Sequence, residues 1–510
     1  MNGDRAETWL RRFGPLAAAV VSIVVVWFVW GAIVPIAKVH DENSYLLQAQ
    51  IFASGRWTAP SPPIPEFFEQ PHVLVVPRLA SKYPPGHALL LSLGALVGFP
   101  PLVPLLLTGI SAALTFGLAM RSFNPWVGLL TWLIWITAPI VLRFQPSYFS
   151  ELTTSVMVLG SWWLLLEWRE TRRRRWLLLL ALAVGWGAIT RPLTMLAVAV
   201  PIGVVVLRDV IRMRLWRDFG LAFGVGLLTL GILPLWNART TGDWRLSPVE
   251  LYRRDYLPFD KVGFTPDTTP PRRHISPALD FAYFESARTQ QTLGALPRTT
   301  WERLTNVFGE WFGGSRATGY RGDVLRLALL AFAVAGLFSM NGTLAFGLTS
   351  AAVLFVAHLP YAHWASWTVY YLEMTPVMAC LGALGMWRAA QRFTATDGAR
   401  QRALSIASIV IALLAVPSIL WWREDHDRRS RFDRVFIDKL RQLPQHSMVF
   451  IRYSPRVKAH MAVVWNYPDL SRVPVWVVHD LGARNAELRR IAPDRVSFDF
   501  EEDQLVGQNR

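Results

Sequence analysis

The stretch His40-Asp41-Glu42-Asn43-Ser44-Tyr45 decides the fold, because it follows a hydrophobic run from Gly14 to Ile36 that is long enough to cross a bilayer. The chain leaves the membrane there, places two adjacent carboxylates at the surface, and stays outside for about sixty residues. A second polar stretch, Lys82-Tyr83-Pro84-Pro85-Gly86-His87, follows about forty residues later, still within this external segment. The sequence therefore predicts a membrane protein whose acids sit at one membrane surface.

Composition supports many spans rather than one. The chain has 510 residues, 52% of them hydrophobic, with 24 Trp and a formal charge of +16, and its mean hydropathy is +0.29. The basic residues form short clusters between apolar runs, which is typical of membrane orientation and speaks against nucleic acid as a partner. The one cysteine, Cys380, lies in an apolar run, so an internal disulfide and a cysteine metal cluster are excluded. The first run is too long for a cleavable signal peptide, and we expect it to be retained.

An all-α polytopic domain over residues 1–421, with about eleven spans, is the predicted architecture. The candidate spans are 14–36, 101–120, 125–142, 152–168, 176–190, 193–207, 219–236, 324–339, 343–357, 367–387 and 403–421. A cytoplasmic N-terminus puts the arginine clusters at 169–175, 208–217 and 388–402 inside and leaves few basic residues in the short outside segments, as the positive-inside rule requires.

This topology requires that residues 83–98 do not cross the membrane, and we expect them to form a short helix at its outer interface. Two external segments follow, 37–100 and 237–323. Residues 422–510 are expected to form a small extracytoplasmic α/β domain. Within it MVFIRYS (448–454) and VPVWVVHDL (473–481) have strand patterns, and RVFIDKLRQL (434–443) and NAELRRIA (485–492) have helix patterns.

Asp41 and Glu42 are the first candidates for chemistry. The plain alternative is a solvated turn in which Asp41 caps a helix beginning near Asn43. At an outer membrane surface, a carboxylate could instead take a proton from an attacking hydroxyl or hold a divalent metal. His40, Asp41, Glu42 and Glu151 are the residues that could form such a metal site.

The topology returns other polar residues to the same face, where ionisable groups point to a functional site. The candidates for binding a phosphate-bearing donor are Lys82, Tyr83, His87, Arg143 and Arg191. The candidates for supporting the site or a metal are His40, Glu151, His358, His363, Tyr370 and Glu373. Snorkelling at a helix end is the alternative for Arg143, and pairing with an arginine is the alternative for Glu151 and Glu373.

These motifs together resemble a known family. The acidic pair after span one, the run YPPGHALLLSLG (83–94), the turn RFQPSYFSELTT (143–154) and the Arg-rich cytoplasmic loops resemble the GT-C membrane glycosyltransferases. More narrowly, they resemble the protein O-mannosyltransferase-like, family-39 type, which includes the aminoarabinose transferases acting on lipid A. The resemblance covers about residues 10–240 well and the later spans only in layout.

The resemblance implies transfer of a sugar from a polyprenyl phosphate on the extracytoplasmic side of a bacterial inner (plasma) membrane. By position, Asp41 would be the base at the acceptor hydroxyl with Glu42 beside it, Lys82 would lie near the donor phosphate, and Arg191 would stabilise the leaving phosphate. Glu151 would match an acidic position that helps to hold the site or a metal. Where many relatives have an Arg-Tyr pair entering a late span, this chain has Tyr370-Tyr371, so a cationic contact is missing there.

Two other functions remain open at this point. A transporter or flippase of lipid-linked glycans would use the acids as proton relays or substrate contacts, and internal repeats would favour it. A scaffold would use the C-terminal domain to hold partners. The sugar and the acceptor, whether a protein hydroxyl, a lipid or another envelope glycan, do not follow from the sequence.

Overall fold

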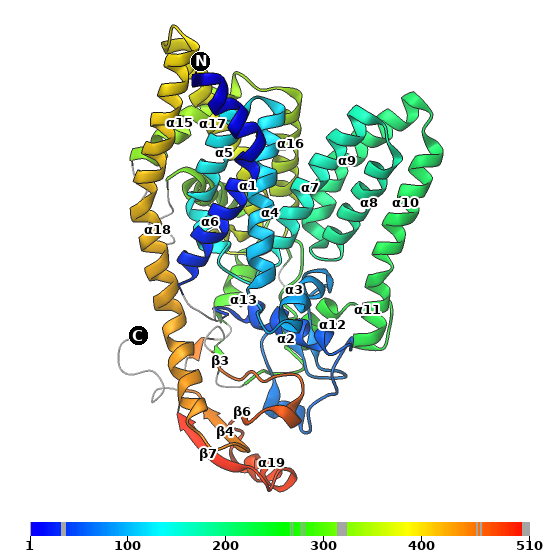
Figure 1. Ribbon diagram of the computed structural model, residues 1–510. Coiled ribbons are helices and arrows are strands. Elements are labelled where there is room, and N and C mark those ends of the chain that lie inside the picture. Colours follow the sequence, from blue (N-terminus) through cyan, green and yellow to red (C-terminus); the bar gives the residue numbers. More distant parts are fainter. Residues whose placement is uncertain are drawn as a thin grey trace.

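The computed structural model describes residues 2–31, 37–265, 267, 269–276, 279–280, 282–313, 324–454, 457–458 and 462–501. The end of the predicted first span (32–36), the end of the second external segment (314–323) and residues 502–510 lie outside the described residues. Helices dominate, and most of them stand side by side in the upper half of Figure 1, with a small sheet at the lower end. We call that lower end the sheet end.

Six described helical segments are long and apolar enough to cross a membrane. They are α1 (Asn2–Trp30), α4 (Leu102–Ser122), α9 (Pro192–Met213), α10 with α11 (Trp216–Leu230 and Ile232–Thr241), the 3-10 turn η4 with α17 (Thr368–Met374 and Thr375–Phe393), and α18 (Asp397–Arg441). A bent pair, α15 (Val324–Leu337) and α16 (Gly342–Ala357), would make a seventh, with 117° between its halves.

The predicted count of eleven spans is therefore not confirmed. The predicted span 125–142 is two helices, α5 (Pro125–Ile136) and α6 (Pro139–Phe144), because Pro139 starts a new helix after the break. The helix α8 (Arg174–Ala188) has 15 residues, about 22 Å at 1.5 Å per residue, which is short of a bilayer core. Helix α7 (Glu151–Thr171) is longer, but polar side chains dilute its hydropathy.

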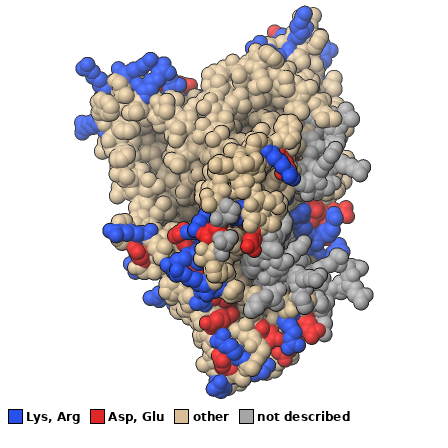
Figure 2. Space-filling view, turned by 180° about the vertical axis from the view of Figure 1, so that it is seen from behind, with Lys and Arg blue, Asp and Glu red and all other residues tan. Residues whose placement is uncertain are grey.

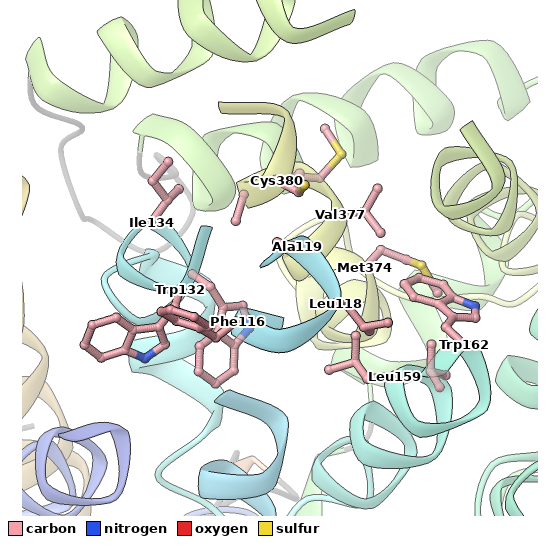
Figure 3. Packing of buried hydrophobic residues seen from close by; sticks show 14 of the residues in the cluster. Phe116, Leu118, Ala119, Trp132, Ile134, Leu159, Trp162, Met374, Val377 and Cys380 are labelled. Carbon is pink, nitrogen blue, oxygen red and sulfur yellow. The ribbon is translucent and has the colours of Figure 1, made fainter. Parts of the chain in front are cut away.

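Between them, α4, α5, α7 and α17 build the main core of the bundle. Figure 3 shows Leu118 and Ala119 of α4 near Val377 of α17, with Leu159 and Trp162 of α7 alongside. Small residues allow neighbouring helices to approach closely. At Gly385 of α17, for example, a side chain would not fit, because its Cβ atom would lie 1.8 Å from the Phe332 carbonyl oxygen of α15. This core holds the helix ends that carry the polar residues.

The sheet end gathers the remaining elements, and its short helices are α2 (His40–Ala53), α3 (Gly86–Leu96), α12 (Pro248–Tyr256), α13 (Ala282–Thr289) and α14 (Leu296–Phe308). Helix α3 has 11 residues, about 16 Å, so it is too short to cross, as expected for residues 83–98. Helix α14 runs into a π-helical turn, η2 (Gly309–Gly313), whose Trp311 and Phe312 are buried in the bundle core.

Three parallel strands form the terminal sheet in the order β6-β4-β7: β4 (Ser447–Arg452), β6 (Val475–His479) and β7 (Val496–Glu501). The central strand β4 is buried over its first five residues, as expected for an apolar run covered on both faces. Helix α19 (Asn485–Ile491) connects β6 to β7. Strands β4 and β6 and helix α19 lie where the sequence predicted them, whereas β7 was not predicted.

The sheet does not pack alone. Val449 and Ile451 share a core with Tyr252 and Tyr256 of α12, and Phe450 shares another with Phe67 of the first segment. Helix α18 also runs without a break through the predicted boundary at 421/422, so the predicted helix 434–443 is its last part.

Charge is distributed unevenly along the bundle. Figure 2 shows a broad area with few charged side chains across the upper half, basic side chains at its top corners, and mixed acidic and basic side chains below. The α7–α8 and α9–α10 turns, which carry Arg172 and Arg214, lie at the end opposite the sheet (Figure 1).

Candidate active site

Asp41 lies in the first turn of α2, at the sheet end of the bundle. The helix begins at His40, and its N-cap Val39 offers no side-chain bond, so the alternative in which Asp41 caps a helix from Asn43 is wrong. The Tyr83 hydroxyl donates to Asp41 Oδ1, and His72 Nε2 lies 3.5 Å from Oδ2. The side chain remains 31% exposed. Asp41 is thus an oriented carboxylate that is still accessible.

Glu42 has a different environment. It is buried, and its two oxygens accept from two backbone amides: Lys38 N to Oε1 at 3.1 Å and Tyr148 N to Oε2 at 2.8 Å. These bonds tie the start of α2 to the chain just before it and to the turn before α7. The structure therefore uses Glu42 to hold the helix start that presents Asp41.

Lys82 provides a cation beside Asp41. Its Nζ lies 5.1 Å from the Tyr83 ring centre and 4.9 Å from that of Tyr252. Burial lowers the pKa of Lys82, and the charges of Asp260 and Asp41 act in the opposite direction. Within the described part of the chain, no carboxylate oxygen lies within 4 Å of this ammonium. Lys82 can therefore receive an anion.

A second charged group lies at the start of α7. Arg191 Nη1 donates to Glu151 Oε1 at 2.6 Å, and Arg191 Nε is 3.9 Å from Glu373 Oε1, which also accepts from Thr154 at 2.5 Å. Both acids are buried, and Glu373 Oε2 has no hydrogen-bond partner among the described residues. Two carboxylates thus share one guanidinium, which is the arginine pairing considered for Glu151 and Glu373.

The late-span aromatic residues meet this second group. The Arg191 guanidinium lies 5.4 Å from the Tyr370 ring centre, which places a cation against Tyr370 where the family resemblance suggested that one was missing. The Tyr370 ring is also 5.5 Å from His358, 4.8 Å from His363 and 5.3 Å from Tyr361. These rings form a wall beside Arg191.

Two predicted donor-binding residues bond to the protein itself. His87 is fully buried, with Nδ1 2.8 Å from Thr153 Oγ1 and Nε2 2.8 Å from the Tyr148 carbonyl oxygen. Arg143 donates to Glu310 Oε1 at 2.7 Å and to the Ser366 carbonyl oxygen at 3.2 Å. Both therefore join segments of the fold in this structure.

Sequence reasoning missed His72, Tyr252 and Asp260. The Ser44 hydroxyl and the Lys82 amide donate to the His72 carbonyl oxygen, while the His72 amide donates to the Tyr252 hydroxyl at 2.9 Å. His72 follows a Pro-rich loop and has a φ of 65°. Nothing in the spacing of such a loop indicates which side chain turns inward.

A metal does not fit the four residues that the sequence suggested for one. The oxygens of Glu42 bind backbone amides, those of Glu151 bind Arg191 and Ser150, and Asp41 is held by Tyr83 and His72. Among the described residues, no group of three or more His, Cys, Asp or Glu could hold a metal ion. We derive no step through a metal.

Comparisons with known proteins identify the fold. No protein-family model matches the chain, and no curated protein sequence matches it. The structure is similar to ArnT from Cupriavidus metallidurans bound to undecaprenyl phosphate, with a TM-score of 0.51 and 16% identity over 96% of this chain and 90% of ArnT. The chain has the GT-C fold.

Two other solved structures of the GT-C fold are more distantly similar. Archaeal oligosaccharyltransferase AglB from Archaeoglobus fulgidus, in complex with an inhibitory peptide and a dolichol-phosphate, gives a TM-score of 0.48 and 12% identity over 87% of this chain and 63% of AglB. Arabinofuranosyltransferase AftD from Mycobacteria gives 0.43 and 15% over 92% and 32%. The similarity to ArnT confirms the predicted resemblance for the GT-C fold.

Proposed function

We propose that the protein is a glycosyltransferase that moves a sugar from a polyprenyl phosphate to an acceptor hydroxyl at the sheet end of the membrane domain. The observation that carries this proposal is Asp41: an accessible carboxylate, oriented by Tyr83 and His72, beside an ammonium with no close carboxylate. The similar ArnT structure holds undecaprenyl phosphate, which supports a lipid phosphate as the carrier.

In the proposed reaction, Asp41 is the general base. The acceptor hydroxyl gives its proton to the carboxylate as its oxygen attacks the anomeric carbon, and the bond from that carbon to the phosphate oxygen breaks. The polyprenyl phosphate departs with one more negative charge than it had in the diester. Lys82 and Arg191 are the cations that we assign to this charge, which develops as the bond breaks.

The remaining assignments follow from these. Glu42 holds the start of α2, and Glu151 and Glu373 hold Arg191. Segments 37–100 and 237–323 would cover the site, and the acceptor would be a protein, lipid or glycan hydroxyl. We keep the division into a membrane domain (1–421) and a C-terminal domain (422–510) as a proposal about what each part does.

Orientation belongs to the same proposal. The positive-inside rule puts the arginine-rich turns in the cytoplasm, and hence the N-terminus inside and the sheet end outside. A donor held in the membrane and an extracytoplasmic site fit a bacterial inner (plasma) membrane. This arrangement also agrees with the absence, in the sequence, of a glycine-rich nucleotide loop.

The alternative is a transporter or flippase of lipid-linked glycans. Transporters bind substrate near the middle of the bilayer between repeats, whereas Asp41, Lys82 and Arg191 all lie at or beside helix ends. This position favours transfer at one face over passage through the membrane.

The test uses the full chain in lipid vesicles with a panel of radiolabelled polyprenyl-phosphate sugars and envelope extracts as acceptors. Wild type should discharge one donor, and Asp41→Asn should bind that donor without turning it over. Movement of the intact lipid across the bilayer by wild type, without discharge of any donor, would establish the transporter instead.

A further inference from the structure

Arg303 on α14 is a cation that is completely buried. Its exposed fraction is 0%, and no described carboxylate oxygen lies within ion-pair distance of it. Its Nη1 donates to the His358 carbonyl oxygen at 2.9 Å, and its Nη2 to those of Tyr361 at 3.0 Å and His363 at 3.1 Å. Burying a charge is costly unless hydrogen bonds replace its hydration. The bonds from Arg303 all go to neutral oxygens, most of them in one loop.

That loop, residues 358–363, has no regular structure of its own to satisfy its carbonyl groups. It leaves α16 and leads to η4. Gln291, in the turn before α14, accepts from Arg303 Nη2 at 3.2 Å and donates to the Leu359 carbonyl oxygen at 2.5 Å. Another amide of the second segment, Gly263 N, donates to the Pro360 carbonyl oxygen at 2.8 Å. The second segment thus fixes the loop mainly through Arg303.

The loop carries part of the wall beside Arg191. Tyr361 packs edge-on against Tyr370, and Tyr370 lies under the Arg191 guanidinium. Burial raises the pKa of Tyr361, and the charges of Asp260 and Asp41 add to the rise. Tyr361 therefore contacts Tyr370 and, through it, the aromatic wall beside the Arg191 guanidinium.

We propose that Arg303 is a positioning residue for the donor head group. By holding the carbonyl groups of residues 358–363, it fixes Tyr361 and Tyr370 where the sugar and phosphate must pass between Arg191 and Asp41. The assignment of the head group rests on the proposed function. A loop displaced by about 1 Å would misplace these side chains and lower kcat/KM for the donor strongly.

The matched pair of variants lies on one helix. Arg303→Lys keeps the charge but cannot reach several carbonyl oxygens at once, because an ammonium lacks the planar fork of a guanidinium. Arg298→Lys is the control, since Arg298 is 83% exposed on α14 and pairs with Glu302 on the same helix. We expect Arg303→Lys to lower kcat/KM for the donor at least tenfold, mainly through KM, and Arg298→Lys to leave it unchanged.

A double-mutant cycle separates positioning from simple support of the fold. If Arg303 acts through Tyr361, Tyr361→Ala should lower kcat/KM, and adding Arg303→Lys to it should cost less than threefold more. Two results would overturn the proposal. In the first, the losses of kcat/KM in the two single variants multiply in full in the double variant. In the second, Arg303→Lys lowers the Tm but leaves kcat and KM at their wild-type values.

Binding of undecaprenyl phosphate, measured for the same variants, keeps the two proposals apart. If wild type turns over a donor and Arg303→Lys turns it over equally well, only the positioning role fails. If wild type turns over no donor, the proposed function fails. The positioning role is then supported if Arg303→Lys raises the Kd for undecaprenyl phosphate at least tenfold relative to Arg298→Lys, and it fails if the two Kd values are equal.

Discussion

Asp41 and Glu151 lie at the same end of the molecule, and their environments are opposite. Neutral or weakly basic donors hold Asp41, namely the Tyr83 hydroxyl and the His72 imidazole, and nearly a third of its side chain is exposed. A guanidinium at 2.6 Å holds Glu151, which is buried together with Glu373 around the same cation. Arg191 and Ser150 occupy the two oxygens of Glu151, and the side chain is buried, so Glu151 is poorly placed to take a proton from a ligand.

This difference indicates that carboxylate side chains have two different roles in one site. An accessible acid oriented by a phenol can take a proton from a ligand, while a buried acid paired with arginine fixes the cation that a ligand meets. Glu42 represents a third use, because backbone amides occupy both of its oxygens. Substitution of Asp41 should therefore affect mainly turnover, whereas substitution of Glu42 or Glu151 should affect mainly stability.

The largest effect is expected from Arg191→Met. It leaves two buried carboxylates without their cation, and breaking a buried pair by removing one partner costs about 3–5 kcal/mol. The measurement is the free energy of unfolding in detergent, with urea as denaturant.

Adding Glu151→Gln to the Arg191→Met chain should restore part of the lost stability, because one of the orphaned charges is removed. If Asp41→Asn destabilised the protein as much as Arg191→Met does, the contrast between the two acids would be lost.

A smaller effect is expected at Glu69, a buried acid that links the first segment to α12 and the sheet. It accepts from Tyr256 and from Arg273 Nη2 at 2.6 Å, and its carbonyl oxygen accepts from His479 at 2.8 Å. Burial raises the pKa of Glu69 to about 7. Between the unfolded pKa, near 4.5, and 7, the folded protein holds a proton that the unfolded chain has released, so stability falls as pH rises through that window.

The Glu69→Gln variant removes this titration. Wild type should lose up to roughly 3 kcal/mol more than Glu69→Gln between pH 4.5 and 8, as measured by the free energy of unfolding at each pH. Glu66→Gln is the control, since Glu66 is 47% exposed and three residues away. Equal pH dependence in wild type and Glu69→Gln would show that the carboxyl does not titrate there.

The smallest effect is expected from Tyr83→Phe. Burial and the Asp41 charge keep the pKa of Tyr83 well above its usual range, so the phenol stays protonated and donates to Asp41. Losing one hydrogen bond to a charged group should lower kcat about tenfold. Tyr45→Phe is the matched control, because Tyr45 stacks on Tyr83 but donates to Ser150 instead. Equal losses in both variants would remove Tyr83 from its assigned role.

The sequence predicted the long apolar helices well, because hydropathy and length are local properties. Helices α4 and α9 lie within a few residues of the predicted spans 101–120 and 193–207. The breaks were harder to predict. Pro139 divides one apolar run into α5 and α6, and the turn before Gly342 bends the next pair by 117°. Packing in three dimensions determines whether such a run crosses, bends or stops.

The sequence indicates which polar residues lie near one another where they flank a helix, but not where a loop folds back, and the roles assigned to these residues stay predictions. Asp41 accepts a hydrogen bond from Tyr83, the residue after Lys82, because α2 and the chain around the start of α3 pack together. His72 joins them from a loop without periodicity, and Arg303 reaches residues 358–363 from 55 or more residues away. The sequence shows that His87 is polar, but not that both of its ring nitrogens are used inside the protein.

The most direct test of the account is a single-turnover measurement with one bound donor, comparing wild type, Asp41→Asn and Glu151→Gln at equal donor occupancy. We expect Asp41→Asn to slow transfer by about 10²–10⁴-fold while changing the free energy of unfolding by less than about 0.5 kcal/mol, and Glu151→Gln to lower stability more. Transfer by Asp41→Asn at the wild-type rate would contradict it, because the base would then be another group.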